Sequence, residues 1–130
     1  MDDQKNIQMW LDRVEYDMDT AKAMLKTGRY IYAIFMCQQS LEKCLKALIA
    51  YQGKEVFPIH NLRRLAEIAS ILHEFDESTL LKLDFLSNYY INARYKEDLN
   101  QLLKGISEAV VHDFIQFTEG IISWLYQKMK

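Results

Sequence analysis

Proline and glycine are scarce in this chain of 130 residues, which contains one proline and four glycines. Few residues therefore interrupt helices, and no segment alternates apolar and polar residues as a half-buried strand does. The glycines, Gly28, Gly53, Gly105 and Gly120, are isolated from one another. A glycine-rich phosphate loop is thus excluded, so any nucleotide would have to be bound by side chains.

Long apolar runs are also missing, and none approaches the roughly 18 residues that a membrane-spanning helix requires. The first residues, MDDQKN, are acidic and polar. A secretory signal instead begins with basic residues and continues with apolar ones. The sequence therefore predicts a cytoplasmic protein with no membrane segment.

Cysteine is rare, and no metal-binding pattern is present. Cys37 and Cys44 are seven residues apart in one predicted helix. Their backbones would stand roughly 10 Å apart, which is too far for a disulfide. No Glu-x-x-His pair precedes His60, His73 or His112, so a di-iron site of the kind built in helical bundles is excluded. We expect buried thiols, no metal and no cofactor.

Charge is nearly balanced, with 16 basic against 18 acidic residues and a formal net charge of −2. Half of the residues are apolar, which is typical of a globular domain, and the length fits a single domain over residues 1–130. Residues 28–64 hold six basic against two acidic residues, whereas residues 65–85 hold one against five. The basic middle could bind phosphate, but for a chain this near neutrality the pattern favours two solvated faces.

Apolar residues recur at three- and four-residue steps, as on one face of a helix. The second of these segments has apolar residues around more than one face, which predicts that it is the central helix. Gly28 is expected to end the first helix, and Gly105 to break the last, so that Ser107 caps a new start. The predicted long helices span residues 7–25, 29–53, 80–93 and 99–125, and Asn61 caps a shorter one of about three to four turns over 62–72.

Together these segments predict an all-α fold, an up-and-down bundle of four long helices with a shorter helix inserted. Large apolar side chains also lie off the main stripes of the first two helices. Such side chains usually mark an interface, and they predict a homodimer. They are Met24, Tyr32, Phe35 and Met36.

One stretch of the predicted central helix is unusually polar. In MCQQSLEKCLKAL, residues 36–48, the spacing of Lys43 and Lys46 places both lysines on neighbouring positions of the helix surface. This arrangement suits an anion-binding face. The alternative is a solvent-facing row stabilised by an internal pair between Glu42 and Lys46.

A second polar stretch, NYYINARYKEDL, covers residues 88–99 at the expected end of the fourth helix. Arg94 and Tyr95 leave the helix there, beside tyrosines that should be partly buried. The stretch fits a phosphate-facing site. It fits equally a helix end at which an arginine is favoured by the helix dipole.

In their order and spacing, these stretches resemble the HEPN domain, named for higher eukaryotes and prokaryotes nucleotide-binding. The resemblance spans roughly residues 7–124. It implies a helical bundle of four to five helices that dimerises, often beside a minimal nucleotidyltransferase in toxin–antitoxin pairs, and in many members an RNA-cleaving site. The residues that carry it are Trp10, Ala21, Tyr30, Ala33, Phe35, QQSLEKCLKAL, the HNL of residues 60–62 and the NARY of residues 92–95.

The ribonuclease members of that family carry an arginine followed by four to six residues and then a histidine. Arg94 occupies the corresponding helix end, but the positions four to seven residues beyond it hold Asp98, Leu99, Asn100 and Gln101. No other arginine has a histidine at that interval. General acid–base help is worth about 10²–10⁴ in rate, so its loss predicts a member without ribonuclease activity.

We therefore expect a non-catalytic HEPN domain that dimerises and binds nucleotide, RNA or a nucleotidyltransferase partner. The residues expected to form the binding face are Lys43, Lys46, His60, Arg94 and Tyr95.

Two alternatives remain at this stage. One is a divergent, metal-independent endoribonuclease in which His60 or His112 supplies the proton beside Arg94. The other is a purely structural helical oligomer in which Arg94 pairs internally with Glu42 or Asp17. Function cannot be taken from the fold alone, so the site has to separate them.

Overall fold

The computed structural model describes residues 2–95, 101 and 104–130, and the side chains of all of these except 2, 3 and 93–95. Every regular element in this described part is helical, which confirms the predicted all-α fold. The elements are α1 (Asp2–Lys26), α2 (Tyr30–Tyr51), α3 (Leu62–Ile68), the 3₁₀ turn η1 (Leu72–Glu74), α4 (Glu77–Tyr95) and α6 (Glu108–Lys128).

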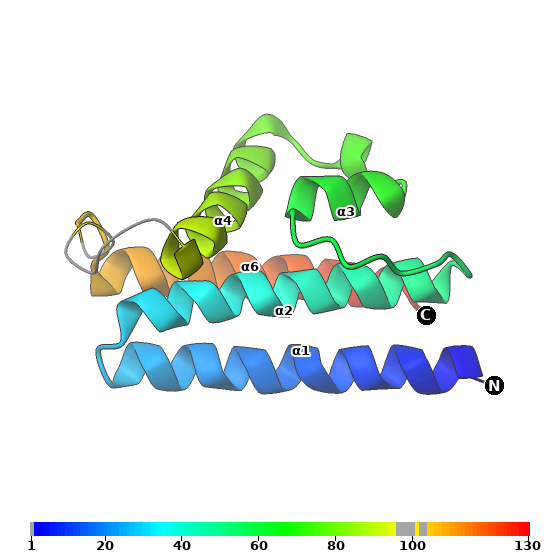
Figure 1. Ribbon diagram of the computed structural model, residues 1–130, viewed down its shortest axis with the longest axis horizontal. Helices are drawn as coiled ribbons and strands as arrows, with labels where there is room; N and C mark the ends of the chain where they lie inside the picture. The colour runs from blue at the N-terminus through cyan, green and yellow to red at the C-terminus, as the bar shows by residue number, and fades with distance from the viewer. Residues whose placement is uncertain (1, 96–100, 102–103) are drawn as a thin grey trace.

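Figure 1 shows α1, α2 and α6 as three long helices with nearly parallel axes, while α4 crosses them at an angle. The first two helices run in opposite directions, so the start of α1 lies beside the end of α2 (Figure 1). The loop after α2 runs back along that helix to α3, which lies beside α4. Because α2 packs against α1, α3, α4 and α6, its predicted central position is confirmed.

The core is built around α2, in which every residue from 40 to 49 is buried. Leu41, Leu45 and Leu48 are its main apolar contribution, and Val14 and Leu125 meet them from α1 and α6. Both cysteines are buried as expected, and desolvation raises the pKa of each thiol to about 12. A helix buried over this length has to bury its polar residues as well.

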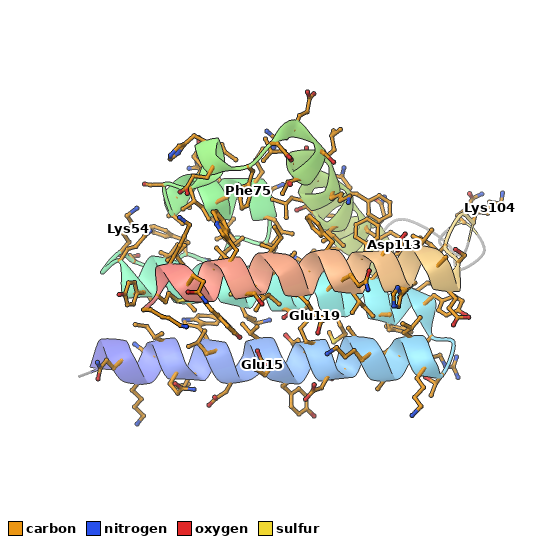
Figure 2. All side chains as sticks on the ribbon, turned by 180° about the vertical axis from the view of Figure 1, so that it is seen from behind. Glu15, Lys54, Phe75, Lys104, Asp113 and Glu119 are labelled. Carbon is orange, nitrogen blue, oxygen red and sulfur yellow. The ribbon has the colours of Figure 1, made fainter. Side chains whose placement is uncertain are left out.

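Polar contacts fasten α6 to α1 on the face seen in Figure 2. Tyr126 donates its hydroxyl to a carboxylate oxygen of Glu15 at 2.6 Å, and Lys22 pairs with Glu119 at 2.6 Å. These contacts join residues about a hundred positions apart in sequence, and they close the bundle on the side opposite α3.

The helix boundaries follow the expected capping residues. The Asn61 side chain accepts a hydrogen bond from the backbone N–H of Arg64 at the start of α3, and Ser107 accepts one from Val110 at the start of α6. Gly28, between α1 and α2, has a φ of 78°, a value that favours glycine. The predicted caps at Asn61 and Ser107 and the predicted stop at Gly28 are confirmed.

The shorter helix differs from the prediction, because α3 has 7 residues rather than three to four turns. Ser70 adopts a φ of 61°, which ends the helix, and the N–H of Ile71 folds back onto a carbonyl of α3. Side chains from the preceding loop complete this end: Gln52 and Lys54 donate to the last free carbonyls of this turn at 2.8 and 2.7 Å. Tertiary partners thus satisfy carbonyls that a longer helix would have used.

Candidate functional site

Glu42 is buried in the middle of α2 and accepts hydrogen bonds from three side chains. Its Oε2 lies 2.8 Å from Lys46 Nζ and 3.0 Å from His60 Nδ1, and its Oε1 accepts from Gln38 at 3.1 Å. Burial raises the pKa of this carboxyl, but the hydrogen bonds from Lys46, His60 and Gln38 outweigh burial and hold the pKa below its usual value. Glu42 is therefore a buried carboxylate that keeps its charge.

His60 connects this buried carboxylate to the protein surface. Its side chain is 47% exposed, in the loop between α2 and α3. Gln38 donates to the backbone carbonyl of His60 at 2.8 Å, so the main chain is held as well as the ring. With Nδ1 on Glu42, the other ring nitrogen, Nε2, points away from the carboxylate. An imidazole oriented in this way can exchange a proton or a hydrogen bond with a ligand through Nε2.

Helix α4 supplies the surface on which the His60 ring rests. The ring centroids of His60 and Tyr90 are 5.2 Å apart, and Phe35 stacks on Tyr90 at 5.1 Å. Arg94 follows Tyr90 by four residues in the same helix, which is about one turn, or roughly 6 Å along the axis. The His60 ring thus packs on α4 at Tyr90, one helical turn before Arg94 in the sequence of that helix.

A second ion pair joins α2 to α1 through Lys43, the residue that follows Glu42. Lys43 Nζ is 3.6 Å from Asp17 Oδ2 of α1 and donates to Gln39 at 3.1 Å, and Gln39 in turn donates to Gln38 at 2.7 Å. Burial raises the pKa of Asp17, and the neighbouring Lys43 only partly offsets it. These contacts form one continuous set, called here the α2 network: Asp17, Gln38, Gln39, Glu42, Lys43, Lys46 and His60.

The structure brings together three of the five residues predicted for the binding face, Lys43, Lys46 and His60. Both lysines are buried, so the alternative interpretation of residues 36–48 as a solvent-facing row is wrong, while its pair between Glu42 and Lys46 is confirmed. The side chains of Arg94 and Tyr95, in the last turn of α4, lie outside the described residues.

The excess of positive charge in residues 28–64 is largely matched by carboxylates once the chain is folded. Arg63 makes two hydrogen bonds to Asp84 of α4, at 3.1 and 2.8 Å, and Arg64 pairs with Glu67 one turn later. Lys43 and Lys46 are matched inside the α2 network. The charge pattern of the linear sequence therefore overstates the positive potential of this face.

Two aromatic contacts of the network were not predicted by the sequence analysis. Tyr90 lies against His60, and the ring of Trp10 in α1 lies 5.8 Å from Lys46 Nζ. The available signal was the spacing of Trp10 and Asp17, seven residues apart, which places both on one face of α1. A helix face that carries a tryptophan and a carboxylate indicates that the helix packed against it presents polar side chains.

Within the residues that the structure describes, no group of three or more His, Cys, Asp or Glu side chains is arranged to hold a metal ion. No helix of this described part combines the length and apolar character needed to cross a bilayer.

The chain is a small helical-bundle domain whose central helix carries buried, mutually paired charges. Residues 7–129 match the HEPN domain family. The chain therefore belongs to the HEPN domain family, as its motifs predicted.

Relatives of similar length agree with this assignment. The Methanocaldococcus jannaschii protein named "Putative toxin MJ1304" is 25% identical over 142 residues, which cover 90% of this chain and 93% of that one. The crystal structure of ST0689, an archaeal HEPN homologue, matches with a TM-score of 0.76 and 25% identity over 95% of this chain and 98% of that one. The crystal structure of TT1696 from Thermus thermophilus has the same fold, with a TM-score of 0.80 and 22% identity over 94% and 97% of the two chains.

Proposed function

We propose that this chain is a non-catalytic, homodimeric HEPN domain that binds the phosphate of a nucleotide or RNA, as the cytoplasmic partner of a nucleotidyltransferase in a toxin–antitoxin-like pair. The observation that carries the proposal is the imidazole of His60, half exposed and held through Nδ1 by the buried carboxylate of Glu42. The M. jannaschii relative carries a toxin name, which supports the paired role.

In this proposal the ligand touches His60 and Arg94, and the buried lysines do not touch it. Lys46 hydrogen-bonds to Glu42, and Glu42 hydrogen-bonds to the imidazole of His60, so the lysine helps to position the His60 ring without touching the ligand. Arg94, about one turn beyond the tyrosine that supports His60, provides the permanent positive charge. An arginine and an imidazole together suit a phosphate, which accepts several charge-assisted hydrogen bonds.

The assignment as a binding domain rests on the sequence after Arg94. No histidine follows at the family's interval, so the usual proton carrier is missing from that position. His60 comes from a different loop, and it is already bound to Glu42 through one nitrogen. As the imidazolium, it can donate through the other nitrogen to a phosphate oxygen.

The test is binding of a fluorescently labelled single-stranded RNA, and of a mononucleotide, measured by anisotropy. Removal of one charge-assisted contact should weaken binding about tenfold or more in Arg94→Ala. The matched control is Arg64→Ala, which removes an exposed arginine paired with Glu67. Equal losses in the two variants would identify non-specific attraction and overturn the site.

The partner is tested separately. The reading frames adjacent to the gene should include a nucleotidyltransferase, and the two proteins should co-purify when they are expressed together. Absence of a complex, with both proteins folded, would remove the paired role and leave the RNA-binding measurement unaffected.

A second candidate function, a divergent metal-independent endoribonuclease, is favoured by one observation. A histidine oriented by a carboxylate is the usual arrangement of a general base, and His60 on Glu42 has this form. RNA cleavage by the wild-type protein that is lost in both His60→Ala and Arg94→Ala, prepared identically, would establish this function and displace the non-catalytic one.

A further inference from the structure

A cavity of about 940 Å³ lies between the start of α1 and the segment where α2 passes into the following loop. Its volume falls within the range of roughly 300–1,000 Å³ typical of small-molecule sites. One wall is formed by α1, with Trp10 as its largest side chain, and the other by Ala50, Gly53 and Val56. Neither His60 nor Tyr90 lines it, so this cavity is distinct from the candidate phosphate site.

The wall opposite Trp10 includes two small residues, Ala50 and Gly53, beside Lys54, Glu55 and Val56. Ala50 presents only a methyl group, and a Cβ built on Gly53 would meet no atom within 4 Å. The indole itself is backed by the ammonium of Lys46, which Glu42 fixes at 2.8 Å. A fixed indole facing small residues leaves space for a flat ring, which stacks favourably on an aromatic side chain.

Helical spacing decides which charge lies beside the indole. Arg13 follows Trp10 by three residues and is therefore its neighbour on the helix surface. Asp12 also lines the cavity, but it follows Trp10 by two residues and is not its neighbour on that surface. On the opposite wall, Lys54 hydrogen-bonds to a carbonyl and a hydroxyl, neither of which neutralises its charge. Glu55 follows Lys54 in the lining. In helical spacing, the charged neighbour of the ring on α1 is thus positive, although the lining as a whole is balanced.

We propose that this cavity binds a flat aromatic or heteroaromatic ring that carries an anionic group, with the ring stacked on Trp10 and the anion at Arg13. This goes beyond the proposed function, because it uses none of the residues assigned there to the phosphate. A guanidinium beside an indole combines stacking with a charge-assisted hydrogen bond.

The test uses three probes with one ring and different charge: indole-3-acetate, 3-methylindole and tryptamine. Binding is followed through the side-chain N–H signals of the two tryptophans in a nitrogen–proton correlation spectrum, with Trp124→Phe to assign them. Indole-3-acetate should shift the Trp10 signal and leave the Trp124 signal in place. Tryptamine should bind about fivefold or more weakly, the effect of one partly exposed charge.

Three variants complete the test, two of which replace an alanine with leucine. Ala50→Leu fills the cavity and should weaken binding of indole-3-acetate about tenfold or more, whereas Ala23→Leu, on an exposed part of α1, should leave it unchanged. Arg13→Gln should remove the preference for the anion. An unmoved Trp10 signal, no effect of Ala50→Leu, or equal binding of indole-3-acetate and tryptamine would overturn the proposal.

Discussion

The ammonium of Lys46 and the carboxylate of Glu42 lie 2.8 Å apart inside the bundle, with 7% and 4% of their side chains exposed. Ion pairs of this kind are stable only when further hydrogen bonds compensate for the loss of water. Here Gln38 and His60 supply them. The pair therefore belongs to the core of the domain as much as to its candidate site.

Removal of one member of this pair should strongly destabilise the fold. Glu42→Ala leaves the ammonium of Lys46 buried without a partner, and it should cost about 3–5 kcal/mol in the free energy of unfolding, measured by urea denaturation. Glu67→Ala, which breaks the exposed pair with Arg64, should cost at most about 1 kcal/mol. Similar costs for both variants would contradict the burial of the Glu42 pair.

Stability should fall in acid because of the same carboxylate. Its folded-state pKa lies below the usual 4.5, so Glu42 stabilises the fold above about pH 4.5 and loses this contribution as the pH falls through the folded value. Denaturation at a series of pH values from about pH 5 downward should show a shallower loss of stability in Glu42→Gln than in the wild type. Asp17, whose pKa burial raises, contributes in the opposite direction. An unchanged slope in Glu42→Gln would show that other carboxylates govern acid unfolding.

The same substitution at two glycines should have effects of opposite sign. Gly28 has a φ of 78°, so Gly28→Ala should destabilise by about 1 kcal/mol or more. Gly120 lies within α6, where a Cβ would meet no atom within 4 Å, so Gly120→Ala should stabilise by up to about 1 kcal/mol. Thermal midpoints measured in parallel test both, and a lower midpoint for Gly120→Ala would indicate a contact at that position, such as one with a second subunit.

The predicted homodimer is tested by sedimentation. Tyr32 is 60% exposed near the start of α2, while Met24, Phe35 and Met36 are half-buried, so Tyr32 is the accessible member of the predicted patch. The wild type should sediment as a dimer at micromolar concentration, and Tyr32→Lys should raise the dissociation constant about tenfold or more. Tyr16→Lys, on the outer side of α1, is the control and should leave it unchanged. A wild-type monomer would contradict the prediction.

Local signals were enough to predict most of the fold. Asn61 and Ser107 act as caps because their side chains reach N–H groups three residues away, and Gly28 ends a helix through its own backbone. The length of α3 depends instead on Gln52 and Lys54, which reach its last carbonyls from another loop. A helix end fixed by distant side chains leaves no periodicity for sequence analysis to detect.

The sequence predicted several residues of the candidate site, but it did not predict their burial or their contacts. Lys43, Lys46 and His60 were selected as unusual polar residues, but their burial depends on partners from α1 and from the loop after α2. The wide apolar surface of α2 contained the missing information, because a helix covered on several sides cannot keep its lysines in solvent. Arg94 and Tyr95 stay predictions, since their side chains lie outside the described residues.

The pair between Asp17 and Lys43 also determines how α1 and α2 slide against each other. Apolar contacts alone tolerate a shift of one helical turn, because leucine, isoleucine and alanine side chains can exchange neighbours at modest cost. Such a shift would bring either Arg13 or Ala21 opposite Lys43. The first would place two positive charges together, and the second would leave a buried ammonium without a carboxylate. This ion pair, together with the buried hydrogen bond from the Ser40 hydroxyl to the Val14 carbonyl, therefore favours a single register between α1 and α2.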